Sequence, residues 1–218
     1  MTDNPVELSR ALRDDPALAG RLAAVDPFAL DGQEARVAFW VNVYNARVRH
    51  ELREHPRRGS LLRHRALFRL CEYRVGEHDY SLDTIEHGLL RRNARPPYSP
   101  RRQLRRRDPR RAAAPPRLDP RIHFALNCGA HSGPLIRPYD AERLDEQLEA
   151  ATRGYFAQET RLERGRNRVV LPGLCKLYAR DFGSRRELLE FAERHMDEPL
   201  SGLRVGFTRF DWTLAPQP

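Results

Sequence analysis

A thiol in a turn of small residues is the strongest chemical signal in this sequence. Residues 119–134 read Asp-Pro-Arg-Ile-His-Phe-Ala-Leu-Asn-Cys-Gly-Ala-His-Ser-Gly-Pro. The alternating apolar positions Ile122, Phe124 and Leu126 predict a strand over 121–127, and Cys128 follows in a glycine-containing turn. Successive backbone N–H groups in such a turn can bind an anion, which in acyl transfer would be an oxyanion. Cys128 is therefore the candidate nucleophile.

A reactive thiol also needs a nearby base or cation that lowers its pKa. His123 lies five residues before Cys128. If the strand ran to the cysteine, the two side chains would point to opposite faces, with their Cα atoms roughly 16 Å apart. His131 could fold back across the turn, and His87 could arrive from another element. Glu86 is a poor orienting group for His87, because neighbours on a helix diverge by about 100°.

Two asparagines mark the longest helix that the sequence predicts, over 34–54. Its apolar residues recur at helical spacing and cover more than one face, so we expect it to be buried on several sides. Asn42 and Asn45 stand three residues apart and hence on one face. Buried amides need hydrogen-bond partners, so these two are either binding residues or ties to neighbouring backbone.

The remaining elements predict an α+β fold. A hairpin is expected over 71–81, with its turn at Gly76, and Ser81 should cap a helix that runs to about Arg91. Further helices are expected over 6–24, from Asp140, before Gly183, and from the capping box Ser184–Glu187 to Met196; strands are expected over 168–171 and within 203–214. The sum is a single helix-rich domain over 34–218 with a small mixed or antiparallel sheet, preceded by an N-terminal helical segment over 1–33.

The positive charge of the chain is concentrated in one stretch. The chain has 218 residues and a net charge of +9; Arg91–Arg117 holds eleven arginines and one acid, Asp108, so it carries +10 and the remainder carries −1. Proline pairs forbid a continuous helix there, and like charges repel. Residues 92–118 are thus expected to form an extended or partly disordered loop. Its function would be to bind a polyanion such as nucleic acid; the alternative is a solvated insertion.

Several protein classes are disfavoured by composition. No apolar run approaches the ~20 residues of a membrane helix, and the polar N-terminus lacks a secretory pattern, so we expect a cytoplasmic protein that does not enter a membrane. Cys71, Cys128 and Cys175 are odd in number and form no C-x-x-C pair, which argues against a disulfide scaffold or a cysteine-rich zinc finger. Nothing in the sequence indicates a cofactor.

Five blocks together resemble the family called domain of unknown function 547. They are Ala38–Asn45, Ser81–Gly88, Asp119–Ser132, Tyr178 with Asp181-Phe182, and Phe210–Leu214. The positions that match the family's motifs are Trp40, Asn42, Tyr44, Asn45, Glu86, His87, His123, Asn127, Cys128, Ser132, Asp211 and Trp212. Two positions depart from the family pattern: Gly133 stands where a second cysteine is usual, and Ala215 where an asparagine often follows. The family implies a fold and motif positions, not an established reaction.

Three functions fit these residues. The first is a cysteine-dependent hydrolase or acyltransferase with Cys128 as nucleophile, His87 or His123 as base, and Asp211 or an asparagine as orienting group. The second is a binding or scaffold module that uses the arginine-rich loop. The third is a metal site with His123, Cys128 and another His or Glu, which the missing second cysteine disfavours. The first predicts that the following residues line one concave site: Glu86, His87, His123, Asn127, Cys128 and Ser132.

Overall fold

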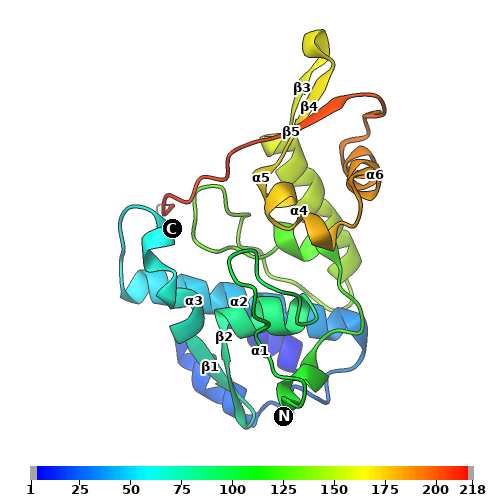
Figure 1. Ribbon diagram of the computed structural model, residues 1–218. Helices are drawn as coiled ribbons and strands as arrows, with labels where there is room; N and C mark the ends of the chain where they lie inside the picture. The colour runs from blue at the N-terminus through cyan, green and yellow to red at the C-terminus, as the bar shows by residue number, and fades with distance from the viewer. Residues whose placement is uncertain (1–3, 216–218) are drawn as a thin grey trace.

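The fold is α+β, as the sequence pattern predicts, and it is built on two hydrophobic cores. The computed structural model describes residues 4–215. Its α-helices are α1 (Pro5–Ala11), α2 (Gly32–Glu54), α3 (Ala66–Leu70), α4 (Leu144–Glu159), α5 (Gly173–Leu177) and α6 (Arg185–Met196). Its strands are β1 (Glu72–Val75), β2 (His78–Ser81), β3 (Arg161–Glu163), β4 (Arg168–Leu171) and β5 (Arg204–Phe207). Figure 1 shows α2 crossing the lower part of the molecule and α4, α5, α6 and the β3–β5 sheet forming the upper part.

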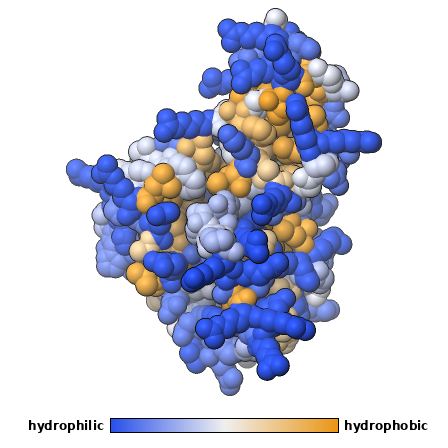
Figure 2. All heavy atoms as spheres, in the orientation of Figure 1, coloured by the Kyte–Doolittle hydropathy of each residue, from blue (hydrophilic) through white to orange (hydrophobic). Residues whose placement is uncertain are grey.

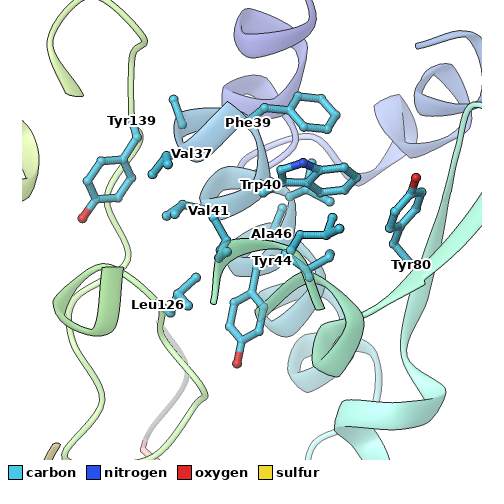
Figure 3. Close-up of a cluster of buried hydrophobic side chains, with 14 of the residues drawn as sticks. Val37, Phe39, Trp40, Val41, Tyr44, Ala46, Tyr80, Leu126 and Tyr139 are labelled. Carbon is cyan, nitrogen blue, oxygen red and sulfur yellow. The ribbon is translucent and has the colours of Figure 1, made fainter. Parts of the chain in front are cut away.

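The first core surrounds α2, which is buried on several sides as expected. Phe39, Trp40 and Val41 are consecutive, and each is completely buried. Consecutive residues point in different directions around a helix, so α2 must be covered all round. Helix α1 packs on one side of it, and the Trp40 ring lies 4.7 Å from that of Tyr80 on β2. Figure 3 shows these rings, with the hydroxyl of Tyr44 directed away from the apolar side chains.

The predicted hairpin is present as β1 and β2, paired antiparallel across the turn at Gly76. Gly76 has φ 55°, and a Cβ there would lie 2.8 Å from the carbonyl oxygen of Val25. Both facts require glycine at the turn. The hairpin leads directly into the segment that carries Glu86 and His87.

The second core lies between α4, α6 and a three-stranded mixed sheet. Strand β4 pairs antiparallel with β3 and parallel with β5. The rings of Phe124, Phe156, Phe182 and Phe191 cluster against one another beneath the sheet. The Ser184–Glu187 capping box predicted from the sequence opens α6, with both reciprocal hydrogen bonds formed.

The predicted strand over 121–127 is wrong. Residues Pro120–Phe124 form a 3₁₀ turn, which begins where the Asp119 side chain accepts a hydrogen bond from the Arg121 N–H. An aspartate cap followed by proline starts a helical turn, and here that local signal outweighs the apolar alternation. The turn removes the 16 Å separation that a continuous strand would impose on His123 and Cys128.

The expectation of an extended or partly disordered loop over 92–118 is also wrong. Leu104 and Ala113 are buried, and the Asn93 side chain exchanges two hydrogen bonds with the backbone of Leu104. The Trp40 indole N–H donates to the Ala113 carbonyl at 3.0 Å. The segment therefore packs on α2 through a few apolar and amide side chains between its arginines. Across residues 4–215, no helix is long and apolar enough to cross a membrane.

Candidate functional site

A cavity of about 710 Å³ at the junction of the two cores collects four of the predicted residues. Glu86, His87, His123 and Cys128 all line it. It is also lined by polar side chains that the sequence analysis did not assign to the site as catalytic or binding residues, namely Tyr44, Asp83, Tyr98 and Tyr178. The cavity has the size of a small-molecule site.

A π-helix over Thr84–Leu90 positions Glu86 and His87. Its wide turn is shown by the hydrogen bond from the Arg91 N–H to the Glu86 carbonyl, five residues back, at 2.8 Å. All seven residues of this helix are buried. π-helical turns are rare and are found frequently at functional sites. The sequence predicts a helix here, but its π geometry carries no signal in the residue pattern.

Glu86 is held by two tyrosines from different cores. The Tyr178 hydroxyl donates to Oε1 at 2.6 Å, and the Tyr44 hydroxyl donates to Oε2 at 3.2 Å. Burial by itself opposes ionisation of Glu86, but the adjacent His87, the hydrogen bond from Tyr178 and the Arg91 charge outweigh it, so the pKa of the carboxyl is lowered. Glu86 therefore places a negative charge at the bottom of the cavity.

Asp181 joins Arg91 to His123. The Arg91 guanidinium binds the Asp181 carboxylate through Nε at 2.5 Å and Nη2 at 2.9 Å. His123 Nε2 lies 2.8 Å from Asp181 Oδ2, and its ring stacks on Tyr178 with centroids 3.8 Å apart. Burial raises the pKa of Asp181, yet the bonds from His123 and Arg91 prevail and bring it to about 2. At His123, burial lowers the pKa of the imidazole more than the Asp181 carboxylate raises it. The ring is therefore neutral at pH 7.

The lone pair of His87 is already in use. Its Nδ1 lies 2.9 Å from Arg91 Nη1; a guanidinium only donates, so Nδ1 accepts and Nε2 carries the proton. Nε2 faces the Tyr98 hydroxyl at 3.0 Å, and that hydroxyl donates to Asp83. Burial, with help from the Arg91 charge, lowers the pKa of His87 to about 4. His87 is thus a fixed neutral donor rather than a free base.

Cys128 reaches the cavity as a half-buried thiol, whereas Cys71 and Cys175 are buried, as predicted. Burial and then the Glu86 charge raise the pKa of Cys128 to about 12, and a hydrogen bond from the Ala130 backbone opposes them. A lowered pKa is what a catalytic Cys128 was expected to have, so the raised value is a correction. The main cause is burial; in addition, the Arg91 guanidinium pairs with Asp181, while the charge that faces the thiol is that of Glu86.

The asparagines shape the backbone around the site. The Asn45 side chain exchanges hydrogen bonds with the Ala125 carbonyl and the Asn127 N–H, each at 2.9 Å. Asn42 does the same with Tyr139, and Asn127 bonds to the Gly129 N–H at 2.7 Å and to the Pro134 carbonyl. None of the three lines the cavity. The amides of Asn45 and Asn127 thus hold the turn that carries Cys128, and that of Asn42 holds the chain at Tyr139.

Ser132 and Asp211 lie outside the cavity lining. Ser132 Oγ accepts a hydrogen bond from the Asp211 N–H at 3.0 Å, and the exposed Asp211 carboxylate accepts one from the Thr213 N–H. That backbone bond lowers the pKa of Asp211. Asp211, which was expected to orient a histidine, therefore bonds to neither His87 nor His123, whereas Asp181 bonds to His123. His131 is exposed, and its N–H pairs with the Thr213 carbonyl.

Three further residues of the site are noticeable in the sequence, but nothing there indicates that they belong to the site. Asp181 stands in the fourth of the five recurring blocks, yet without a role assigned to it. Arg91 is the first arginine of the basic stretch and hence looked like one charge among many. Tyr98 is the lone aromatic of that stretch. Among the side chains of residues 4–215, no group of three or more His, Cys, Asp or Glu is placed to hold a metal ion.

Comparison with known proteins gives one family and no individual relative. A family model described as "Protein of unknown function, DUF547" matches residues 29–156. No curated protein and no solved structure matches the chain. The matched range includes Tyr44, Glu86, His123 and Cys128, whereas Asp181 lies beyond it.

Proposed function

Because the chain belongs to the DUF547 family of proteins of unknown function, we propose its function from the cavity: a cysteine-dependent hydrolase or acyltransferase that uses Cys128, His123 and Asp181. The observation that carries the proposal is that His123 and Cys128 line the same cavity, and that His123 pairs with Asp181 behind it. A nucleophile, a base and a group that orients the base are the parts of a catalytic triad. Here they come from one turn and from the second core.

The ring of His123 is oriented for a base. Its Nε2–H donates to Asp181, so the lone pair of a neutral ring is on Nδ1. No residue from 4 to 215 forms a hydrogen bond to that Nδ1. The stacked Tyr178 ring and the bidentate Arg91–Asp181 pair fix the imidazole in place. Asp181 would also stabilise the imidazolium that forms when the ring takes a proton.

The reaction follows from a neutral thiol and a neutral imidazole. His123 Nδ1 takes the thiol proton as Cys128 Sγ bonds to the substrate carbonyl carbon, and the C=O electron pair moves to the oxygen. The Ala130 N–H, which hydrogen-bonds to the thiol, can donate to that oxygen. When the oxygen re-forms C=O, the leaving group departs with the imidazolium proton. Water or another acceptor then attacks the thioester and releases Cys128.

The test is to trap the acyl-enzyme with 4-nitrophenyl butyrate and to locate the added acyl group by peptide mass spectrometry. The wild type should carry it on Cys128, and Cys128→Ser should carry none. His123→Gln should acylate at least tenfold more slowly, since general-base catalysis contributes about 10²–10⁴-fold. Cys175→Ala is the matched control and should behave as wild type. Acylation of His123→Gln at the wild-type rate, in a protein with an unchanged thermal midpoint, would contradict the proposal.

A second function, nucleic-acid binding by the basic stretch, is favoured by one observation. Five of its exposed arginines form neither an ion pair nor a side-chain hydrogen bond that is recorded within residues 4–215: Arg95, Arg101, Arg105, Arg106 and Arg107. Such unpaired charges suit phosphate contacts. Fluorescence anisotropy with a single-stranded oligonucleotide should show affinity that falls steeply with salt, and replacing Arg105, Arg106 and Arg107 by Gln should flatten that slope. Salt-independent binding would contradict this function.

A further inference from the structure

The charges of the cavity are separated by depth. The acids that line it are Asp83 and Glu86, both at most 8% exposed. The arginines that line it are Arg63, Arg65 and Arg69, and all three are exposed. A ligand that enters this cavity therefore passes cations first and meets the anionic floor last.

The three arginines come from one short segment at the cavity mouth. It runs from the 3₁₀ turn Leu61–His64 through the linking Arg65 into helix α3, and its compact turns place these side chains at one edge of the cavity. None of the three arginines forms an ion pair with an acid in residues 4–215. Burial raises the pKa of Asp83 to about 6. The Arg69 charge opposes this rise through space, without a hydrogen bond to Asp83. The mouth therefore presents positive charge without a matching surface acid.

Apolar side chains occupy the walls between mouth and floor. Leu62 and Phe68 belong to the arginine segment, and Leu62 is 50% exposed. Leu177, Phe210 and Trp212 line the cavity from the second core and the C-terminal segment, and the last two rings pack 4.5 Å apart. Figure 2 shows one face of the molecule, on which separate hydrophobic patches lie among hydrophilic side chains. An apolar stem would bury against these walls at ~25 cal/mol per Å².

We propose that the cavity takes an acyl compound whose apolar stem ends in an anionic group, a carboxylate or a phosphate, which the three arginines bind at the mouth. The position of the carbonyl beside Cys128 rests on the proposed function. The anionic end does not, because it depends only on the distribution of charge and apolar surface. Guanidinium groups suit both anions, since their donors match carboxylate and phosphate oxygens in pairs.

The experiment measures binding in the Cys128→Ser variant, so that no reaction is needed. The probes are the N-methyl monoamide of suberic acid, its methyl ester, and a phosphate-terminated analogue of the same chain length, titrated by calorimetry. The acid and the phosphate should bind at least tenfold more tightly than the ester. The Arg63→Gln/Arg65→Gln/Arg69→Gln variant should bind all three equally, at the affinity of the ester.

The matched control is Arg105→Gln/Arg106→Gln/Arg107→Gln, which removes the same charge from exposed positions outside the cavity lining. It should retain the tenfold preference. Equal binding of acid and ester by the parent variant, or loss of the preference in the control, would overturn the proposal. Selective binding without any acyl-enzyme in the wild type would leave the anion site standing and refute the thiol chemistry.

The source of the anion is decided by competition. Vesicles of phosphatidylcholine with phosphatidate that displace the dissolved acid would show that a lipid headgroup can occupy the mouth. If they do not displace it while the dissolved phosphate analogue does, the ligand is a free small anion. Phosphatidylcholine vesicles alone are the control and should not compete.

Discussion

At the residue scale, burial and the Glu86 charge together determine the pKa of the Cys128 thiol. They raise it to about 12, while the nearby cation Arg91 is engaged by Asp181. At neutral pH the thiol is protonated, so in the reaction proposed above its proton must leave during the attack rather than before it. This separates the site from those in which a cysteine and a histidine form an ion pair in the resting enzyme.

Replacing Glu86 by Gln should make the thiol more reactive. The amide has the same shape but removes the charge that disfavours the thiolate, so the pKa of Cys128 should fall. We expect iodoacetamide to modify Cys128 several-fold faster in Glu86→Gln than in the wild type at pH 8, read site by site by mass spectrometry.

Cys71 and Cys175 are internal controls for that measurement. Both are buried, and burial raises the pKa of each, so in the native protein they should react more slowly than half-buried Cys128. A Glu86→Gln rate equal to that of the wild type would mean that Glu86 does not act on the thiol. Equal rates at all three cysteines in the wild type would argue against a cysteine enzyme.

His87 should make the fold sensitive to mild acid. Its folded pKa of about 4 lies below the usual value near 6.5. The unfolded chain therefore binds the proton first as the pH falls, and the stability that neutral His87 contributes is lost between pH 6.5 and 4. The size of this effect is roughly 3 kcal/mol, from 1.36 kcal/mol per pKa unit.

The His87→Gln variant isolates that contribution. Urea unfolding at pH 7 and pH 4 should show a smaller drop in the free energy of unfolding for the variant than for the wild type. His64, which is half-buried and bonds only to the Arg58 carbonyl, offers His64→Gln as the control with an unchanged drop. An identical drop in all three proteins would show that His87 does not titrate as described.

At the element scale, the basic stretch behaves as part of the fold. Its prolines and charges predict little packing, but Leu104 is only 2% exposed and lies against Gly88 of the π-helix. A Cβ added at Gly88 would sit 3.1 Å from the Leu104 side chain. The stretch thus covers the element that carries Glu86 and His87, so removing it should destabilise the protein rather than leave it unchanged.

A single substitution measures this packing. Leu104→Ala should lower the free energy of unfolding by about 2–4 kcal/mol, the cost of removing a buried leucine. Leu135→Ala is the control, because Leu135 is 69% exposed and its loss should change stability by less than about 0.5 kcal/mol. If both variants unfold at the same denaturant midpoint, the basic stretch is dispensable, as the composition suggests.

At the scale of the whole molecule, the Arg91–Asp181 pair joins the two cores. Arg91 follows the π-helix, Asp181 follows α5, and each side chain is 4% exposed. Removing one partner of a buried pair leaves an uncompensated charge, which costs about 3–5 kcal/mol. Asp181 of the same pair also bonds to His123, so this contact between the cores fixes the ring of the residue that we propose as the base.

A double-mutant cycle tests this coupling. Asp181→Ala alone should lower the free energy of unfolding by about 3–5 kcal/mol, and Arg91→Met added to it should recover part of the loss, because the stranded guanidinium is gone. The exposed pair Arg186–Glu190 serves as the control cycle, with a coupling below about 1 kcal/mol. Strictly additive losses at Arg91 and Asp181 would show that the pair does not couple the cores.

The elements expected from the sequence are found mainly where residues close together in the chain determine the local structure. Helix α2, the hairpin at Gly76, strand β4 and the capping box of α6 all follow from spacing, turn residues and caps within a few positions. The strand expected over 121–127 fails for a local reason as well, since the Asp119-Pro120 cap is a stronger signal than three alternating apolar residues.

The sequence by itself determined the α+β class, the family blocks and four of the residues that line the cavity, because these depend on residue type and short-range spacing. Only the tertiary structure decided that Asp181 rather than Asp211 bonds to His123, that Arg91 occupies the lone pair of His87, and that Glu86 faces the thiol. The contact between His123 and Asp181 spans 58 positions, and the Arg91–Asp181 pair beside it spans 90. The packing of the two cores determines which buried charged groups are paired with each other. Burial and these pairings then determine the pKa values on which the proposed chemistry depends.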